Sequence, residues 1–229
     1  MLSLKVRLSR KHAQDLSFSP FYPNKLACAS GQYYGIAGSG SLDIITLPDV
    51  PGAPTGALAG APTGVQGAQP VVQSLPWSDC LFSVAWSEKN EHVIVTGSGD
   101  GSIQVYDINN NKGPVAALKG HTREVSCVHW CQCRLVNHLF MSASWDSCIK
   151  IWNGETLQMV SDLPNRHDSL IYEVQSSPLV HGLFGSCSGD GMVKLWNMNS
   201  AHQPMGGWVA HPQAEVLSLD WCKYNQVCK

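Results

Sequence analysis

The sequence predicts an all-β fold of repeated four-stranded sheets, a β-propeller, and three recurring markers predict it. Asp-containing turns at 98–101, 144–147 and 188–191 place their aspartates 46 and then 44 positions apart. An aromatic residue followed by Asp or Asn comes six positions after each of these aspartates, and His121, His167 and His211 repeat with the same two intervals. Short runs of β-branched and aromatic residues, separated by Gly, Asn and Asp, lie between the markers. About four short strands in each repeat of this length are typical of a propeller blade.

The markers divide the chain into six parts. Residues 1–47 are predicted to hold an N-terminal strand and a degenerate first blade, in which Ser39-Gly40 stands where the turn aspartate is expected. Residues 48–76 are predicted to be a low-complexity linker loop, because they are mostly Gly, Pro and Ala, with Asp49 as their one charged residue. We expect the second, third and fourth blades at 77–119, 120–165 and 166–209, and the first strand of a fifth within 210–229. Four blades and a fragment leave a propeller ring incomplete, so we expect the chain to be C-terminally truncated.

The recurring polar residues are predicted to form a structural network in each blade. An Asp in a tight turn accepts backbone N–H bonds, the His before the first strand can bond that Asp, and a Ser on the second strand and an aromatic on the third can extend the network. A catalytic triad occurs once, whereas this set recurs three times, so the pattern favours a structural role and no enzyme is predicted. The predicted network residues are Asp100, Asp146, Asp190, His121, His167, His211, Tyr106, Trp152 and Trp196.

Composition and charge exclude several other classes of protein. Apolar residues make up 44% of the chain, so a sizeable core can be buried. The formal net charge of −2 argues against a protein that binds nucleic acid, which needs a basic stripe. No apolar run is long enough to insert into a bilayer.

The cysteines are odd in number, scattered, and not preceded by an apolar signal peptide. This pattern predicts free, partly buried thiols in a reducing compartment. The nine are Cys28, Cys80, Cys127, Cys131, Cys133, Cys148, Cys187, Cys222 and Cys228.

One cluster could be drawn as a metal site, from His129, Cys131, Cys133 and His138. Its Cys-x-Cys spacing is poor for tetrahedral zinc, which favours two or more intervening residues. The sequence therefore predicts no metal and no cofactor.

The repeats resemble the WD-repeat family of β-propellers, well over residues 77–221 and weakly over 12–47. Three repeats place Trp86, Trp130 and Trp221 at one position, where the fourth blade has Ser176. Loop segments are more specific and resemble the family of receptors for the type 2 peroxisomal targeting signal, a family of WD-repeat peroxins. The segments that carry this second resemblance are 18–23, 26–29, 34–38, 86–93 and 215–225.

The resemblance implies a cytosolic receptor that shuttles to the peroxisome and delivers cargo proteins for matrix import. The cargo signal is a short N-terminal amphipathic helix: a basic residue, an aliphatic residue, five variable positions, His or Gln, then Leu or Ala. A peroxin co-receptor would help to hold the signal, and the complex would dock at the peroxisomal membrane. The alternative is a generic WD-repeat scaffold, such as a substrate adaptor of a ubiquitin ligase, against which the loop segments argue.

A basic helical ligand requires acidic acceptors and apolar contacts. The turn before each innermost strand of a propeller opens at one rim, and these turns contain the acids Asp79, Glu124, Asp168 and Glu215. Exposed ion pairs contribute at most about 1 kcal/mol each, so apolar side chains must add affinity. The expected apolar contacts are Trp77, Leu81, Trp145 and Tyr172.

The first fourteen residues contain Lys5, Arg7, Arg10 and Lys11 and no acid. Lys5-Val6, five residues and then His12-Ala13 fit the cargo-signal pattern itself. The segment also suits a transit peptide or the lead-in strand of the first blade, and the sequence leaves these alternatives open.

Overall fold

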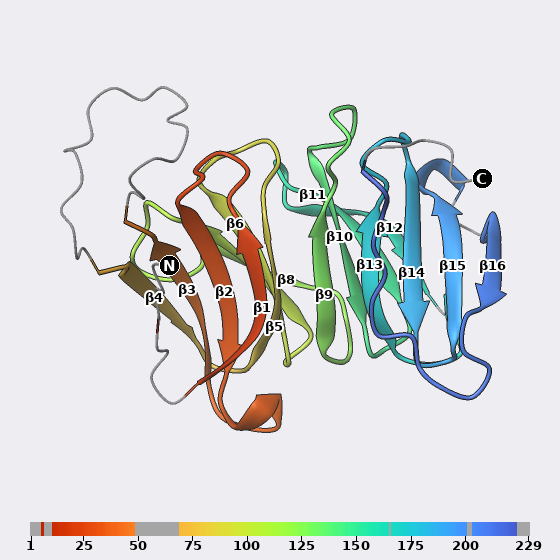
Figure 1. Cartoon of the computed structure of the whole chain (residues 1–229), viewed down its shortest axis with the longest axis horizontal. Coiled ribbons are helices and arrows are strands. Elements are labelled where there is room, and N and C mark those ends of the chain that lie inside the picture. Colours follow the sequence, from red (N-terminus) through yellow and green to blue (C-terminus); the bar gives the residue numbers. More distant parts are fainter. Residues whose placement is uncertain (1–5, 7–10, 49–68, 165, 201–202, 224–229) are drawn as a thin grey trace, which may run out of the picture.

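The computed structural model describes residues 6, 11–48, 69–164, 166–200 and 203–223. It is an all-β propeller arrangement of four antiparallel four-stranded sheets. The sheets follow one another in chain order, and their innermost strands contact each other in sequence (Figure 1). No helix among the described residues has the length and apolar character needed to cross a membrane.

Each sheet is an antiparallel meander of four strands. The first contains β1 (His12–Phe18), β2 (Lys25–Gly31), β3 (Gly40–Thr46) and β4 (Val71–Trp77). The second contains β5 (Leu81–Trp86), β6 (Val93–Ser98), β7 (Ser102–Asp107) and β8 (Ala116–Lys119). The third contains β9 (Val125–Trp130), β10 (Leu139–Ser144), β11 (Ile149–Asn153) and β12 (Gln158–Leu163). The fourth contains β13 (Ile171–Ser176), β14 (Leu183–Ser188), β15 (Met192–Asn197) and β16 (Gly206–Val209). Two 3-10 turns, η1 (Tyr33–Gly35) and η2 (Met198–Ser200), lie in connections.

The hydrophobic core lies between the sheets. One buried cluster joins the first and second sheets, another the second and third, and a third the third and fourth. The second strand of a sheet is covered on both faces, so β6, β10 and β14 are buried along almost their whole length. Aromatic rings fill the widest gaps: Phe140 stacks between Trp130 and Trp152, with ring centroids 5.2 and 6.2 Å away.

Strand β4 lies inside the range that the sequence assigns to the linker. It pairs with β3 from Gly40↔Trp77 to Thr46↔Val71 and supplies the outer strand of the first sheet. Residues 71–76 are therefore part of the sheet, because their alternating side chains complete the register of β3. Residues 49–68 of the predicted linker lie outside the described residues.

Residues 210–223 contain no strand, although the sequence predicts the first strand of a fifth blade there. The segment 216–221 nevertheless lies against the fourth sheet in the place of an inner strand. The Leu219 N–H donates to Glu173 (2.8 Å), and the Trp221 indole donates to the Gln175 carbonyl (3.1 Å). Among the described residues, no strand pairs with this segment. The final residues, 224–229, lie outside the described residues, as does most of the signal-like segment 5–13, of which His12 and Ala13 belong to β1.

The buried cysteines among the described residues, Cys28, Cys80, Cys127, Cys131 and Cys187, are free thiols. Burial raises the pKa of the Cys28 and Cys80 thiols to about 11. These buried thiols act as small apolar side chains.

Candidate functional site

The inner strands all begin at one rim of the molecule, which lies at the bottom of Figure 1. The turns that precede β5, β9, β13 and the segment 216–221 meet at this rim, and they contain Asp79, Glu124, Asp168 and Glu215 respectively. We call this edge the acidic rim. Glu124 and Glu215 occupy the same place in their repeats, directly before the first residue of the inner segment.

A β-bulge recurs where each inner strand leaves the acidic rim. The pairing with the second strand skips Gln14, Phe82, Ser126 and Tyr172 in the four sheets. A bulged residue has no partner in the ladder, so its side chain can be aimed differently from its neighbours. Two of these bulge residues are aromatic, and Leu217 stands at the same place in the last segment with 62% of its side chain exposed.

Tyr172 and Glu215 form the tightest pair on the rim. The Tyr172 hydroxyl donates to a Glu215 carboxylate oxygen at 2.7 Å. Burial, and then this carboxylate, raise the pKa of Tyr172 to about 12, so the hydroxyl keeps its proton. Gly189 leaves room for the pair, since a Cβ there would lie 3.3 Å from Glu215 Oε1. The phenol thus holds Glu215 in place rather than serving as a bare apolar contact.

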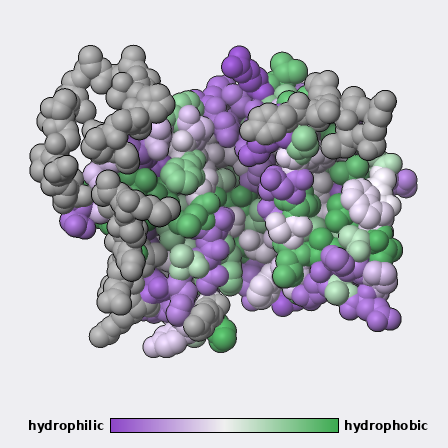
Figure 2. All heavy atoms as spheres, in the orientation of Figure 1, coloured by the Kyte–Doolittle hydropathy of each residue, from purple (hydrophilic) through white to green (hydrophobic). Residues whose placement is uncertain are grey.

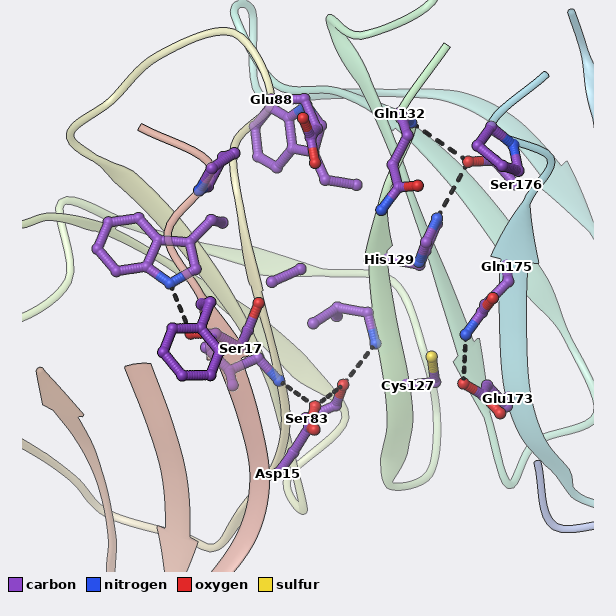
Figure 3. Close-up of a pocket in the computed structure, with 18 of the residues that line it drawn as sticks. Asp15, Ser17, Ser83, Glu88, Cys127, His129, Gln132, Glu173, Gln175 and Ser176 are labelled. Atoms are coloured by element: carbon purple, nitrogen blue, oxygen red, sulfur yellow. Dashed lines mark hydrogen bonds between the residues drawn. The ribbon is translucent and has the colours of Figure 1, made fainter. Parts of the chain in front are cut away.

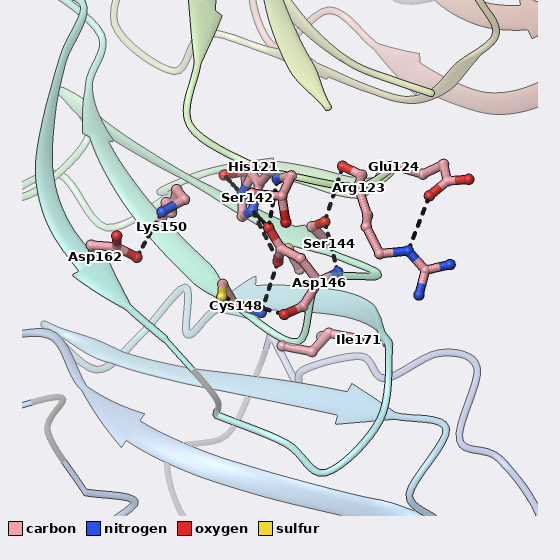
Figure 4. Close-up of polar contacts among 12 residues, drawn as sticks. His121, Arg123, Glu124, Ser142, Ser144, Asp146, Cys148, Lys150, Asp162 and Ile171 are labelled. Carbon is pink, nitrogen blue, oxygen red and sulfur yellow. Dashed lines mark hydrogen bonds and ion pairs between the residues drawn. The ribbon is translucent and has the colours of Figure 1, made fainter. Parts of the chain in front are cut away.

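Trp145 and Glu124 come together in the middle of the rim. The backbone N–H of Trp145 donates to the backbone carbonyl of Glu124 (3.0 Å), and the ring centroids of Trp145 and Phe82 lie 5.8 Å apart. Arg123 Nε lies 3.7 Å from the Glu124 carboxylate, and both side chains are partly exposed (Figure 4). Glu124 therefore has a cation beside it in the unbound protein, although an exposed pair at this distance is weak.

The two remaining acids sit earlier in their turns. Asp79 accepts the N–H of Cys80 (2.7 Å) and faces Gly99, where a Cβ would lie 3.0 Å from the carboxylate. Asp168 is exposed, and its N–H donates to Asp190 (3.1 Å). The four carboxylates lie on one rim, but their positions within the turns and their hydrogen-bond partners differ.

Two of the expected apolar contacts lie elsewhere. Leu81 is fully buried in the cluster between the first and second sheets. Side chains alternate along a strand, so the bulge residue Phe82, one position later, faces the rim instead. Trp77 is half-buried against the same cluster, and its indole donates to Ser98 (3.0 Å). Sequence reasoning missed Phe82, yet its position, equivalent to that of Tyr172, could have identified it.

Two buried polar networks hold the rim turns of the third and fourth sheets. In the third sheet, His121 bonds Asp146 (2.9 Å) and Ser142 (2.8 Å), and Trp152 donates to Ser142 (2.9 Å) (Figure 4). The fourth sheet repeats the set with His167, Asp190, Ser186 and Trp196. Burial opposes ionisation of Asp146, but the His121 bond and two backbone N–H groups outweigh it and hold its pKa well below the usual range.

The other sheets depart from this network. In the second sheet, within the part of the chain that the structure describes, Asp100 accepts from Ser102 and from no histidine, while Thr96 bonds Gln104. Tyr106 is fully buried there in place of a tryptophan. In the first sheet Asp43, on β3, replaces the missing turn aspartate and accepts from Ser30, Ser41 and Ser74. His211 is exposed and joins no such set among the described residues.

The inner strands also line a polar hollow of about 390 Å³, away from the rim turns (Figure 3). Asp15 accepts the Val84 N–H (2.9 Å), and Ser83 accepts the Val128 N–H (3.1 Å), so these side chains tie each inner strand to the next. His129 bonds Ser176 (3.0 Å), and burial lowers its pKa to about 4. Within the described residues, no group of three or more His, Cys, Asp and Glu is placed to bind a metal.

Figure 2 shows hydrophobic and hydrophilic residues intermixed on the face that the inner strands present. The rim differs from this face because it concentrates carboxylates and three large side chains at bulge positions. Phe82 and Leu217 are apolar, and Tyr172 is a phenol bonded to Glu215. This combination can bind a cation and an apolar surface at the same time.

Comparison with known proteins identifies the family of the repeats. The family model described as "WD domain, G-beta repeat" matches residues 70–107 and 112–153. Each match begins at or just before the outer strand of one sheet and ends at the third strand of the next, which is why β4 belongs to the repeat.

Curated relatives carry a more specific name. The chain is 38% identical over 173 residues to the "Peroxisomal targeting signal 2 receptor" of Mus musculus, which is 76% of this chain and 48% of that relative. It is 39% identical over 173 residues to the protein of the same name from Homo sapiens, again 76% of this chain and 48% of the relative. For the Saccharomyces cerevisiae protein of that name, identity is 34% over 163 residues, 69% of this chain and 38% of the relative. The chain spans about half the length of the curated relatives it matches.

Proposed function

We propose that this chain, a WD-repeat protein whose curated homologues are named peroxisomal targeting signal 2 receptors, binds the N-terminal type 2 targeting signal of cargo proteins for peroxisomal matrix import. One combined observation carries the proposal. The similarity to these relatives extends over most of the chain, and the same chain has a rim of carboxylates beside aromatic bulge residues. The ligand is a basic amphipathic helix.

The acidic rim would bind the basic residue of the signal. Glu215 is fixed by Tyr172, and Glu124 holds the same place two repeats earlier in the chain. Both carboxylates would accept hydrogen bonds from a Lys or Arg side chain. Asp79 and Asp168 would add to the negative potential that attracts such a ligand. The aliphatic face of the helix would rest on Phe82, Trp145 and Leu217, since exposed ion pairs alone contribute little affinity.

The proposal includes partners that follow from the family. A peroxin co-receptor would cover the bound helix, a docking complex at the peroxisomal membrane would receive the loaded receptor, and the receptor would move between cytosol and peroxisome. No catalysis is assigned, because the His121 and His167 side chains are fully buried and bonded within their own sheets.

A peptide-binding assay tests the proposal. A fluorescent signal peptide is titrated with the chain, alone and with a co-receptor, beside a peptide whose basic residue is changed to Glu. The unmodified peptide should bind saturably, and the Glu peptide at least tenfold more weakly. Equal binding of both peptides would indicate a generic scaffold and overturn the proposal.

A matched pair of variants locates the site. Glu124→Lys should weaken binding about tenfold, because it replaces an acceptor by a repelling cation. Glu91→Lys makes the same charge change at an exposed position in the β5–β6 connection, on the opposite rim, and should change affinity less than twofold. Circular dichroism should be the same for both. An equal loss in the two variants would mean that net charge, not the acidic rim, controls binding.

A further inference from the structure

The β2–β3 connection is a hairpin held rigid by its own hydrogen bonds. Gln32 anchors it: its N–H donates to the Ser39 carbonyl (3.1 Å) and its side-chain oxygen accepts the Ser39 N–H (3.1 Å). The Gln32 carbonyl accepts the Gly35 N–H (2.9 Å), which closes the η1 turn. The connection lies at the same edge as the acidic rim, at the bottom of Figure 1.

The hairpin presents large apolar side chains to solvent. Ile36 is 88% exposed and Tyr33 is 70% exposed. Tyr33 also has a φ of +45°, a left-handed conformation that costs a residue with a Cβ of the order of 1–2 kcal/mol. Most of the surface of both residues is therefore in contact with solvent.

The hairpin packs directly on the proposed binding site. Gly35 lies against Phe82, such that a Cβ on Gly35 would be 2.8 Å from the ring. At the base of the hairpin, Gly40 approaches the Asp79 carbonyl so closely that a Cβ would be 2.5 Å from it. The hairpin therefore contacts the aromatic bulge residue Phe82, and its base contacts the main chain of Asp79.

We propose that the hairpin 32–39 is an apolar seat for the aliphatic face of the signal helix, an inference that rests on the function proposed above. An amphipathic helix with a basic residue on one side and aliphatic residues on another matches this arrangement, since the hairpin presents Tyr33 and Ile36 at the same edge of the molecule as the carboxylates of the acidic rim. Of the apolar contacts expected from sequence near the hairpin, Leu81 at the start of β5 is in the core and Trp77 at the end of β4 is packed against it. Preorganisation of the hairpin lowers the entropy lost when the helix binds.

Two substitutions test the seat without removing a charge. Ile36→Ser should weaken binding of the fluorescent signal peptide about fivefold, as expected for loss of one aliphatic contact. Tyr33→Asn should weaken it about as much while keeping or raising the melting temperature, because Asn tolerates the left-handed conformation better than Tyr. Lower affinity without lower stability separates a binding role from a structural one. Leu135→Ser, at a 71% exposed position in the β9–β10 connection on the opposite rim, is the matched control and should leave affinity unchanged.

Two measurements distinguish failure of the apolar seat from failure of the proposed function: the dependence of affinity on ionic strength, and binding of the signal peptide by the unmodified chain. The slope of affinity against ionic strength should be unaltered in Ile36→Ser but shallower in Glu124→Gln, since only the second removes a charge. Unaltered affinity in both hairpin variants, with the unmodified chain still binding the peptide, would overturn the seat and leave the proposed function standing. Absence of saturable binding to the unmodified chain would overturn both.

Discussion

Strands β1 and β5 occupy the same place in neighbouring sheets, but only β5 has another sheet packed against the face compared here. On β5, Val84 and Trp86 are 4% and 3% exposed, because they pack against the first sheet. The equivalent residues of β1, Leu16 and Phe18, are 59% and 65% exposed. The side chains are alike in kind, so the neighbouring sheet, and not the strand itself, decides their burial.

This difference shows where the stability of the fold resides. A four-stranded sheet here buries its apolar side chains only by stacking on the next, as in other repeat arrangements whose units cannot form a core alone. The far end agrees: the contacts of Glu173 with Leu219 and of Trp221 with Gln175 repeat those of Asp15 with Val84 and of Trp86 with Ser17. The segment 216–221 thus partly covers the fourth sheet.

The largest expected effect tests the comparison directly. Trp86→Ala should lower the free energy of unfolding by about 3–5 kcal/mol, because it empties a packed site and removes the hydrogen bond from the indole to the Ser17 carbonyl (2.9 Å). Phe18→Ala, at the equivalent uncovered site, should cost less than about 1 kcal/mol. Urea denaturation followed by far-ultraviolet circular dichroism measures both. Similar losses in the two variants would break the comparison, since cover would then not decide the outcome.

A second test asks how much a sheet gains from polar groups within itself. Asp146→Ala should cost about 2–3 kcal/mol, because it leaves the buried His121 imidazole and the backbone N–H groups of Thr122 and Cys148 without their acceptor. Asp100→Ala is the control at the equivalent turn, where no histidine is bonded, and should cost about 1 kcal/mol. Melting temperatures of the two variants provide the measurement. Equal shifts would mean that the histidine bond makes no additional contribution to stability.

The sequence was sufficient for the parts of the fold that repeat. The Asp turns, the histidines and the Trp positions recur at fixed intervals, so the sheets and their order could be predicted from them. Strand β4 could not, because Val71 and Val72 follow a Gly-, Pro- and Ala-rich stretch and show their role only when paired with β3. Nor could the role of Asp43, whose bonds to three serines depend on which strands become neighbours.

The place of the acids in the fold was predictable from the repeat, and the place of the apolar side chains near them was less so. Glu124 and Glu215 hold a fixed spacing to Trp130 and Trp221, so their shared rim follows from the repeat. Leu81 was expected in place of Phe82 because a β-bulge shifts which residue faces outward, and a one-residue shift moves a side chain to the other face. The exposed hairpin at Tyr33 does not recur in the other repeats, so the repeat pattern does not predict it.

A third, smaller effect uses a titratable group that the fold buries. Burial lowers the pKa of His167, although its bond to Asp190 opposes the change, so the folded protein holds the neutral imidazole more readily than the unfolded chain does. The unfolded chain therefore binds more protons below its own His pKa of about 6.5, and stability should fall as pH drops from there toward the lower folded pKa. Urea midpoints between pH 7.5 and 5.5 should decrease, and His167→Gln should flatten the decrease. The exposed His181→Gln should leave it unchanged; a matching effect there would exclude His167 as the cause.

The smallest effect on overall stability belongs to the segment 216–221, which covers the fourth sheet without forming a strand. Glu173→Ala removes the acceptor of the Leu219 N–H, so the segment should open more often while the four sheets stay folded. Limited proteolysis should cut within 216–223 several times faster in the variant, with a global urea midpoint within error of the unmodified chain. Asp15→Ala removes the equivalent acceptor between β1 and β5, where both partners are full strands, and should lower the global midpoint without new cleavage. If Glu173→Ala lowered the midpoint as much as Asp15→Ala, the last segment would be an integral part of the core, and the two ends of the molecule would be covered alike.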